Sequence, residues 1–223
     1  MKIVALNGSP RGTASTTLRL LEAAMEGAEE AGAVVQYFDV ARHDIAYCTG
    51  CGTCYASGSC ILEDDYADIL AAMEGADGFL VASPVYINAI TAQLKTLIDR
   101  MADVVHCQKF RGKYAAFLAS GGGGGTDCVL GYLGEAWQVF GADVVGGAAA
   151  VMAEGEDRFA AAMDESRALG EHLVEAVATR AAYPEQEAFH EGMRERMTAL
   201  VSAHRDEWPS EYAYLRSLGW IRE

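Results

Sequence analysis

The stretch KIVALNGSPRGTASTT, residues 2–17, decides the fold. Residues 2–6 form a short apolar run, which is typical of a strand buried on both faces of a parallel sheet. Residues 7–17 are rich in glycine and hydroxyl side chains. They lead into a predicted helix that continues to about Ala31, with Leu18 and Leu21 at helical spacing. A strand, a loop and a helix in this order begin an α/β domain.

The hydroxyl-rich loop suits a phosphate group. It ends where a helix presents free backbone N–H groups and the positive end of its dipole, and Arg11 adds a charged donor. The loop has neither the GK[ST] of a Walker loop nor the GxGxxG of a dinucleotide site. The alternative is that Ser15 or Thr16 only caps the helix.

The rest of the chain continues the alternation. The pattern predicts strands at 34–40, 78–82, 114–119 and 144–151, with helices at 64–75, 89–105, 127–140 and 156–179. We therefore expect a doubly wound, five-stranded parallel sheet of order 2-1-3-4-5 with helices on both faces. The ligand crevice of such a sheet lies between strands one and three, at the carboxyl edge.

Two further loops follow predicted strands at that edge. Residues 83–89, SPVYINA, combine a proline, an aromatic ring and an amide, which can flank a planar ligand. Otherwise Val85, Tyr86 and Ile87 cover the next helix. Residues 120–126 contain five successive glycines, which indicates either a close approach to a ligand or a flexible loop. One ligand in the crevice would contact all three loops.

Residues 47–63 contain four of the six cysteines in the spacing C-x2-C-x2-C-x5-C. Glycines at 50, 52 and 58 allow left-handed turns, so the segment can curl around one small object and direct its sulfurs inward. This pattern favours a cubane iron–sulfur cluster. A zinc site, two local disulfides and unmetallated thiols are the alternatives. The candidate ligands are Cys48, Cys51, Cys54 and Cys60.

Composition and charge restrict the class of partner. Of the 223 residues, 17 are basic and 32 acidic, which gives a formal net charge of −15. Such a chain repels nucleic acid and anionic membranes, so we expect neither as a partner. No segment has the pattern of an export signal or a membrane span, and we expect a cytoplasmic protein. The basic residues that gather at 95–113 either let an anionic partner dock or form a solvated helix end.

Four motifs together resemble one family: residues 8–11 (GSPR), the cysteine run followed by Asp64 and Asp65, residues 83–86 (SPVY), and the segment from Lys95 to Arg100. The combination, over roughly residues 1–150, is similar to the flavodoxin-like NADPH-dependent FMN reductase superfamily. Within it, the cysteine spacing resembles the iron–sulfur flavoproteins, which bind FMN and a [4Fe-4S] cluster.

The resemblance implies a flavodoxin-like FMN-binding domain at 1–181, with the cysteine loop 47–63 inserted in it. It implies that the FMN phosphate is held by Ser9, Arg11, Ser15 and Thr16, with Thr17 also at the cofactor. It further implies that the flavin ring lies between one wall of Pro84, Val85, Tyr86, Ile87 and Asn88 and another of Ser120, Gly121 and Gly122. The cofactors carry the chemistry, so no catalytic acid–base side chain is required.

The function that we expect is an FMN- and [4Fe-4S]-containing oxidoreductase. It would transfer electrons between NAD(P)H or a ferredoxin-like donor and a small-molecule acceptor. The alternative is an NAD(P)H-dependent FMN, quinone or nitro reductase without a cluster. A passive electron carrier and a biosynthetic dehydrogenase are further hypotheses.

Residues 182–223 extend beyond the expected domain. They predict a helix at 185–207 and then an aromatic-rich end with two tryptophans, Trp208 and Trp220. An arm of this kind must cover an apolar surface. We expect it to clasp a second chain in a homodimer or homotetramer, and the alternative is packing on its own domain.

Overall fold

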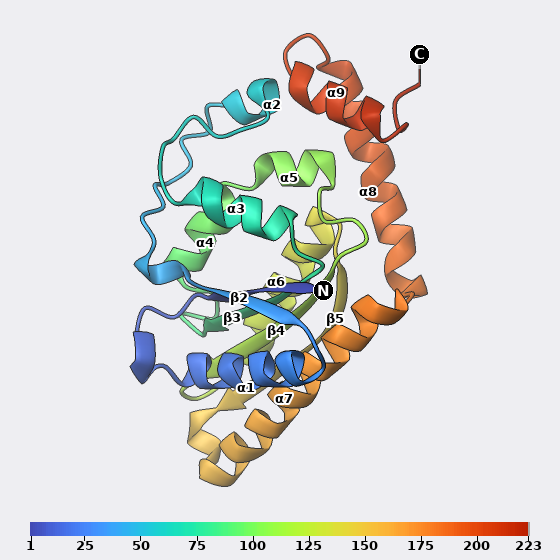
Figure 1. Ribbon diagram of the computed structural model, residues 1–223. Helices are drawn as coiled ribbons and strands as arrows, with labels where there is room; N and C mark the ends of the chain where they lie inside the picture. The colour runs from blue at the N-terminus through green and yellow to red at the C-terminus, as the bar shows by residue number, and fades with distance from the viewer. Residues whose placement is uncertain (223) are drawn as a thin grey trace.

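The sheet has five parallel strands in the order β2-β1-β3-β4-β5, as predicted (Figure 1). The structure, a computed structural model, describes residues 1–222. The strands are β1 (Lys2–Asn7), β2 (Val34–Asp39), β3 (Gly78–Pro84), β4 (Tyr114–Gly121) and β5 (Asp143–Val151). Each strand lies within two residues of its prediction. The parallel order places the loops after β1, β3 and β4 at one edge.

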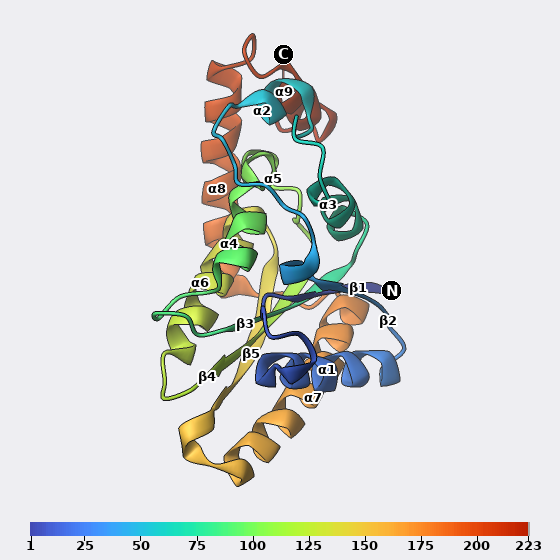
Figure 2. The same cartoon turned by 90° about the vertical axis from the view of Figure 1, so that its left-hand side faces the viewer.

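Helices cover both faces of the sheet, as Figure 2 shows from the side. Alternate residues of β1 divide between two cores: Ile3 and Ala5 face one, and Val4 and Leu6 face the other. The first face is covered by α1 (Thr16–Glu30) and α7 (Glu156–Thr179). The second is covered by α3 (Tyr66–Glu74), α4 (Ala92–Asp99), α5 (Ala102–Cys107) and α6 (Thr126–Phe140).

The helices α1 and α7 pack closely because each presents a glycine. A Cβ at Gly170 would lie 1.9 Å from the Ala24 carbonyl oxygen, and a Cβ at Gly27 would lie 2.1 Å from that of Arg167. Neither backbone carbonyl can move away as a side chain can. These two glycines therefore set the distance between the helices that support one face of the sheet.

The prediction of one continuous helix at 89–105 is wrong. The chain forms α4 and α5, which are separated at Arg100 and Met101. The Arg100 carbonyl accepts the Tyr66 hydroxyl at 2.7 Å. This contact comes from a distant element, so helical periodicity gave no sign of it. The start also shifts to Ala92, because Thr91 caps the helix.

The C-terminal arm is helical and packs on its own chain. It consists of α8 (Pro184–Ala203) and α9 (Pro209–Ser217), and the second helix was not predicted. Gln186 bonds with both the N–H and the carbonyl of Val144, at 2.8 and 2.9 Å, and His190 lies 3.1 Å from Asp143. This is the intrachain alternative. A clasp around a second chain stays a prediction.

Candidate functional site

The loop after β1 is fixed by its own side chains. The Asn7 side chain accepts the N–H of Ser9 at 3.0 Å, and the Ser15 hydroxyl accepts a backbone N–H at 3.1 Å, which caps α1. Ser9 and Ser15 are buried, whereas Arg11 is exposed. Ser15 therefore caps the helix, and its role at a phosphate stays a prediction. A single cap leaves other N–H groups of the first turn available to a ligand.

The loops after β1 and β4 meet through hydroxyl groups. Ser120 Oγ lies 2.6 Å from Thr17 Oγ1 and 3.3 Å from Thr16 Oγ1. Both Ser120 and Thr17 are buried. Three of the predicted site residues are thus neighbours in space although about a hundred positions separate them in the sequence.

The loop after β3 is joined to both of the others. The Val85 N–H donates to the Ser120 carbonyl at 2.8 Å, and the Thr91 hydroxyl donates to the Gly8 carbonyl at 2.6 Å. The Thr91 N–H also donates to the Ser83 hydroxyl at 3.1 Å. Sequence reasoning missed Thr91. The signal was present, because a threonine directly before an apolar helical pattern predicts a cap.

The tip of the β3 loop is a tight turn that directs two apolar side chains outward. Ile87 and Asn88 have left-handed φ values of 52° and 56°, and Tyr86 pairs with Ala89. The left-handed region is strained for a β-branched residue. Ile87 is 98% exposed and Tyr86 is 45% exposed. The Ile87 side chain and the Tyr86 ring therefore do not cover the following helix, and they border the edge where the three loops meet.

The glycine run is explained in part by close contacts. A Cβ at Gly125 would lie 2.7 Å from Asn88 Oδ1, and one at Gly121 would lie 2.6 Å from the Gly124 carbonyl oxygen. Gly122 and Gly123 have nothing within 4 Å of such a Cβ and are exposed. The two close-packed glycines, Gly121 and Gly125, lie against Val85, and the open part of the run is the segment between them.

A buried ion pair closes the base of the cysteine loop, residues 47–63. Arg100 donates to Asp64 at 2.7 and 3.2 Å and to the Ala46 carbonyl at 2.8 Å, and the Ala46 N–H donates to Asp64 at 2.9 Å. The side chains of Arg100 and Asp64 are 1% and 6% exposed. We call Ala46, Asp64 and Arg100 the loop neck. It holds together the residues that precede and follow the four cysteines.

Protonation of Asp64 is suppressed at the loop neck. Burial by itself would raise the pKa of this carboxyl, but hydrogen bonds from Arg100 and from the N–H groups of Ala46 and Tyr66 outweigh it. The pKa of Asp64 is consequently below its ordinary value. The ion pair stays formed at neutral pH.

All four cysteines of the loop are free thiols, and a short helix, α2 (Thr53–Ser57), lies among them. Cys48 and Cys51 are exposed, and Cys54 and Cys60 are half-buried. The predicted left-handed glycines are present, with φ of 66°, 71° and 80° at Gly50, Gly52 and Gly58. Within residues 1–222, however, no three His, Cys, Asp or Glu side chains are grouped closely enough to hold a metal.

The thiols differ in acidity. Burial, then the charges of Asp103 and Cys60, raise the pKa of Cys54 to about 11. Hydrogen bonds from Thr53, and then Thr49, lower the pKa of Cys51. A metal needs thiolates, so ligation by Cys54 would have to release a bound proton. The donor set, four free thiols on a glycine-rich loop with a closed neck, fits an iron–sulfur cluster in its chemistry.

The sequence model of the NADPH-dependent FMN reductase family matches residues 1–157. The chain belongs to this family. It is 39% identical over 149 residues to an iron–sulfur flavoprotein of Archaeoglobus fulgidus, with 66% of each chain covered. It is 33% identical over 150 residues to an iron–sulfur flavoprotein of Methanosarcina thermophila, with 66% of this chain and 78% of that protein covered. Within the family, it is therefore one of the iron–sulfur flavoproteins.

The matched region spans 66% and 62% of the lengths of the A. fulgidus relative and of one from Methanocaldococcus jannaschii, so less than two thirds of each. Solved structures share the fold. An NADH:FMN oxidoreductase in its apo form superposes with a TM-score of 0.61 at 24% identity, covering 83% of this chain and 92% of that one. An NAD(P)H:quinone oxidoreductase from Methanothermobacter marburgensis gives 0.64 at 21%, covering 78% and 96%.

The C-terminal arm of this flavoprotein lies against the cysteine loop, and α2 and α9 are neighbours in both views (Figures 1 and 2). The Trp208 ring centroid is 4.9 Å from that of Tyr55 and 5.1 Å from that of His106. The buried carboxylate of Glu211 lies 3.1 Å from His106 Nδ1. An aromatic stack and a buried polar pair therefore join the arm to α2 and α5.

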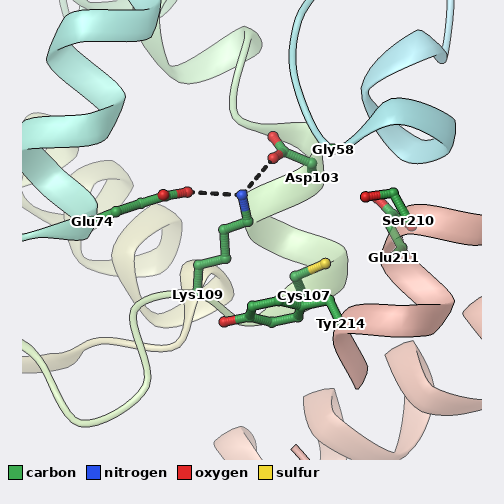
Figure 3. A pocket seen from close by; sticks show the side chains of 8 residues that line it. All are labelled: Gly58, Glu74, Asp103, Cys107, Lys109, Ser210, Glu211 and Tyr214. Atoms are coloured by element: carbon green, nitrogen blue, oxygen red, sulfur yellow. Dashed lines mark hydrogen bonds and ion pairs between the residues drawn. The ribbon is translucent and has the colours of Figure 1, made fainter. Parts of the chain in front are cut away.

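A pocket of about 410 Å³ lies where α5, α9 and the cysteine loop meet (Figure 3). The Lys109 side chain extends across it, and its Nζ lies 2.7 Å from Glu74 and 2.8 Å from Asp103. With Glu211 on the opposite side, carboxylates outnumber the one lysine. Cys107 is buried there, and burial, then the charge of Glu211, raises its pKa to about 12. The pocket disfavours an anion.

The basic residues at 95–113 are held by partners within the chain, and the docking of an anionic donor on them stays a prediction. Acidic side chains pair with four of them, and Lys113 donates to backbone carbonyls of α3 and the following turn. The four are Lys95, Arg100, Lys109 and Arg111. Separately, no helix formed by residues 1–222 has both the length and the apolar character to cross a membrane.

Proposed function

We propose that this chain is a flavin-dependent oxidoreductase that binds FMN at the carboxyl edge of its sheet and a [4Fe-4S] cluster in the cysteine loop. It would transfer electrons between NAD(P)H or a ferredoxin-like donor and a small acceptor. The observation that carries the flavin half is the set of hydrogen bonds joining the loops after β1, β3 and β4. The names of its relatives support the cluster.

The residues at the sheet edge fit FMN. Its phosphate would lie at the start of α1 against Ser9 and Thr16, where backbone N–H groups and the helix dipole favour an anion. Arg11 is exposed beside it and can add a charged donor. The ring would lie between residues 84–88 and the open glycines of the β4 loop. FMN supplies hydride and single-electron transfer when bound.

The cluster would be held by Cys48, Cys51, Cys54 and Cys60 and would supply single-electron transfer. The loop neck brings the chain on both sides of these ligands together. The arm covers the half-buried side of the loop and so limits the access of water to that side. A dry surround is one of the factors that set the potential of such a cluster.

A first test separates the two cofactors. Protein purified without air is treated with a chelator that strips iron, and FMN binding is then followed by the quenching of flavin fluorescence. We expect FMN to bind with unchanged affinity to the iron-free protein, because the two sets of residues are separate in the fold. If neither the untreated protein nor the iron-free protein bound FMN, the proposal would be contradicted.

The alternative is a reductase with no cluster. It is favoured by the dispersed positions of the four thiols, since no metal-binding group is formed by the described residues. Iron and acid-labile sulfide in anaerobically prepared protein distinguish the two functions. NAD(P)H oxidation with a quinone acceptor that is equally fast in the Cys51→Ala variant and in the native chain would support the alternative.

A further inference from the structure

A buried hydrogen-bond donor at the loop neck has no partner. Arg100 uses its two terminal nitrogens for Asp64 and the Ala46 carbonyl, but its Nε–H completes no hydrogen bond. The whole side chain is 1% exposed, so water does not replace the missing acceptor. An unsatisfied charged donor in such a position requires an explanation.

The guanidinium itself is held rigidly. It stacks over the Tyr66 ring at 4.4 Å, and the Tyr66 hydroxyl bonds to the Arg100 carbonyl. The bidentate contact with Asp64 fixes the plane of the guanidinium. Arg100 is therefore a preorganised donor, and its free N–H cannot easily turn toward another group.

Cys60 lies in the same region as this guanidinium, because it is four residues before Asp64, which Arg100 contacts at 2.7 Å. Burial lowers the pKa of Arg100, whereas Asp64 and then Cys60 raise it, and the net effect is a pKa above its ordinary value. Cys60 is half-buried and packs against the core that contains Tyr66.

We propose that Arg100 is a positioning residue that donates its Nε–H to the sulfur of Cys60 when this cysteine is a cluster ligand, and thereby raises the reduction potential of the cluster. This inference rests on the proposed [4Fe-4S] site. A hydrogen bond to a ligand sulfur stabilises the more negative, reduced cluster and so favours reduction. The Arg100 side chain would then both close the cysteine loop and adjust the reduction potential of the cluster in it.

The test measures the midpoint potential of the cluster by redox titration followed by EPR, after iron and sulfide have been determined for each protein. Arg100→Lys keeps the positive charge and loses the Nε–H. The double variant Arg100→Gln with Asp64→Asn also removes the donor and leaves the net charge unchanged. It avoids an unpaired buried carboxylate, so it remains informative if the single variant does not fold.

We expect Arg100→Lys and the double variant to have a lower midpoint potential than the native protein. Asp64→Asn alone loosens the neck but keeps the donor and removes a negative charge, so its potential should rise. Arg19→Lys is the matched control, because Arg19 also stacks on a ring, at 4.5 Å from Phe159, on the opposite face of the sheet. Its potential should be unchanged.

Native potentials in both Arg100 variants, with full iron and sulfide content, would overturn the inference and leave the cluster proposal intact. A fall in potential in Asp64→Asn as large as in Arg100→Lys would also overturn it, since a purely structural neck predicts the same effect for both. Native protein that contains no iron or sulfide would overturn the cluster proposal, and the inference with it.

Discussion

At the scale of single residues, the candidate flavin site depends on Ser120. Its hydroxyl lies 2.6 Å from Thr17 Oγ1, and its carbonyl accepts the N–H of Val85, so it joins three loops. We predict that Ser120→Ala weakens FMN binding about tenfold, because a buried threonine hydroxyl loses its partner, at a cost of about 1–3 kcal/mol. Fluorescence titration with FMN measures this.

Ser166→Ala is the matched control, since Ser166 is equally buried but its hydroxyl bonds only to a carbonyl within α7. Its FMN affinity should equal that of the native chain. Equal affinities in all three proteins would mean that Ser120 does not support the flavin site.

Asp64 makes a second prediction at this scale. Its folded pKa is depressed, so its stabilising effect is full above the unfolded pKa of about 3.9 and disappears as pH falls through the folded value. At pH 7, Asp64→Asn should lower the free energy of unfolding by about 3–5 kcal/mol, because Arg100 stays buried without its partner.

Urea unfolding at a series of pH values checks this. The difference between native protein and Asp64→Asn should shrink as the pH falls below about 4. Asp68→Asn, an exposed change in the first turn of α3, is the control and should have little effect at any pH. A difference that stays constant down to pH 2 would show that the carboxylate charge does not stabilise the loop neck.

At the scale of elements, the contact of α1 with α7 is the most constrained. We predict that Gly170→Ala lowers the free energy of unfolding by about 3 kcal/mol or more, because the new methyl group meets a backbone carbonyl at 1.9 Å. Gly131→Ala in α6 is the control. Its Cβ would have nothing within 4 Å, and it should gain about 0.5–1 kcal/mol from helix propensity. Equal effects in chemical denaturation would contradict this packing.

The arm makes another prediction for elements. Trp208→Ala removes the ring that contacts Tyr55 and His106. We expect backbone amides of residues 53–57 to exchange hydrogen about tenfold faster, which corresponds to about 1.4 kcal/mol of lost local stability. In the control Trp220→Ala, the lost contact is with Arg194 in α8, and exchange in α2 should not change. Native exchange rates in Trp208→Ala would mean that the arm does not hold the loop.

Local patterns predicted the elements that local forces determine. Apolar runs located all five strands, and hydroxyl and glycine loops at their ends indicated the sheet edge where Thr17 and Ser120 meet. Sequence reasoning failed where contacts between residues far apart in the sequence determine the local structure. The break at Arg100 depends on Tyr66, and the loop neck depends on Asp64, 36 positions away.

At the scale of the whole molecule, the two candidate cofactor sites lie on different parts of the fold. The flavin site is at the carboxyl edge of the sheet, and the cysteine loop extends from that edge over α4 and α5 to α9 (Figure 1). The arm therefore adds to the domain a cover for the loop. This separation explains why the two halves of the proposal can be tested independently.

The most direct test is one anaerobic preparation examined by visible absorption and by EPR after reduction, with FMN, iron and sulfide determined on the same sample. We predict one FMN per chain, about four iron atoms and four sulfides, and the EPR signal of a reduced cubane cluster. A colourless protein that binds no added FMN would contradict the account. A yellow protein without iron would contradict its cluster half and leave the cluster-free reductase.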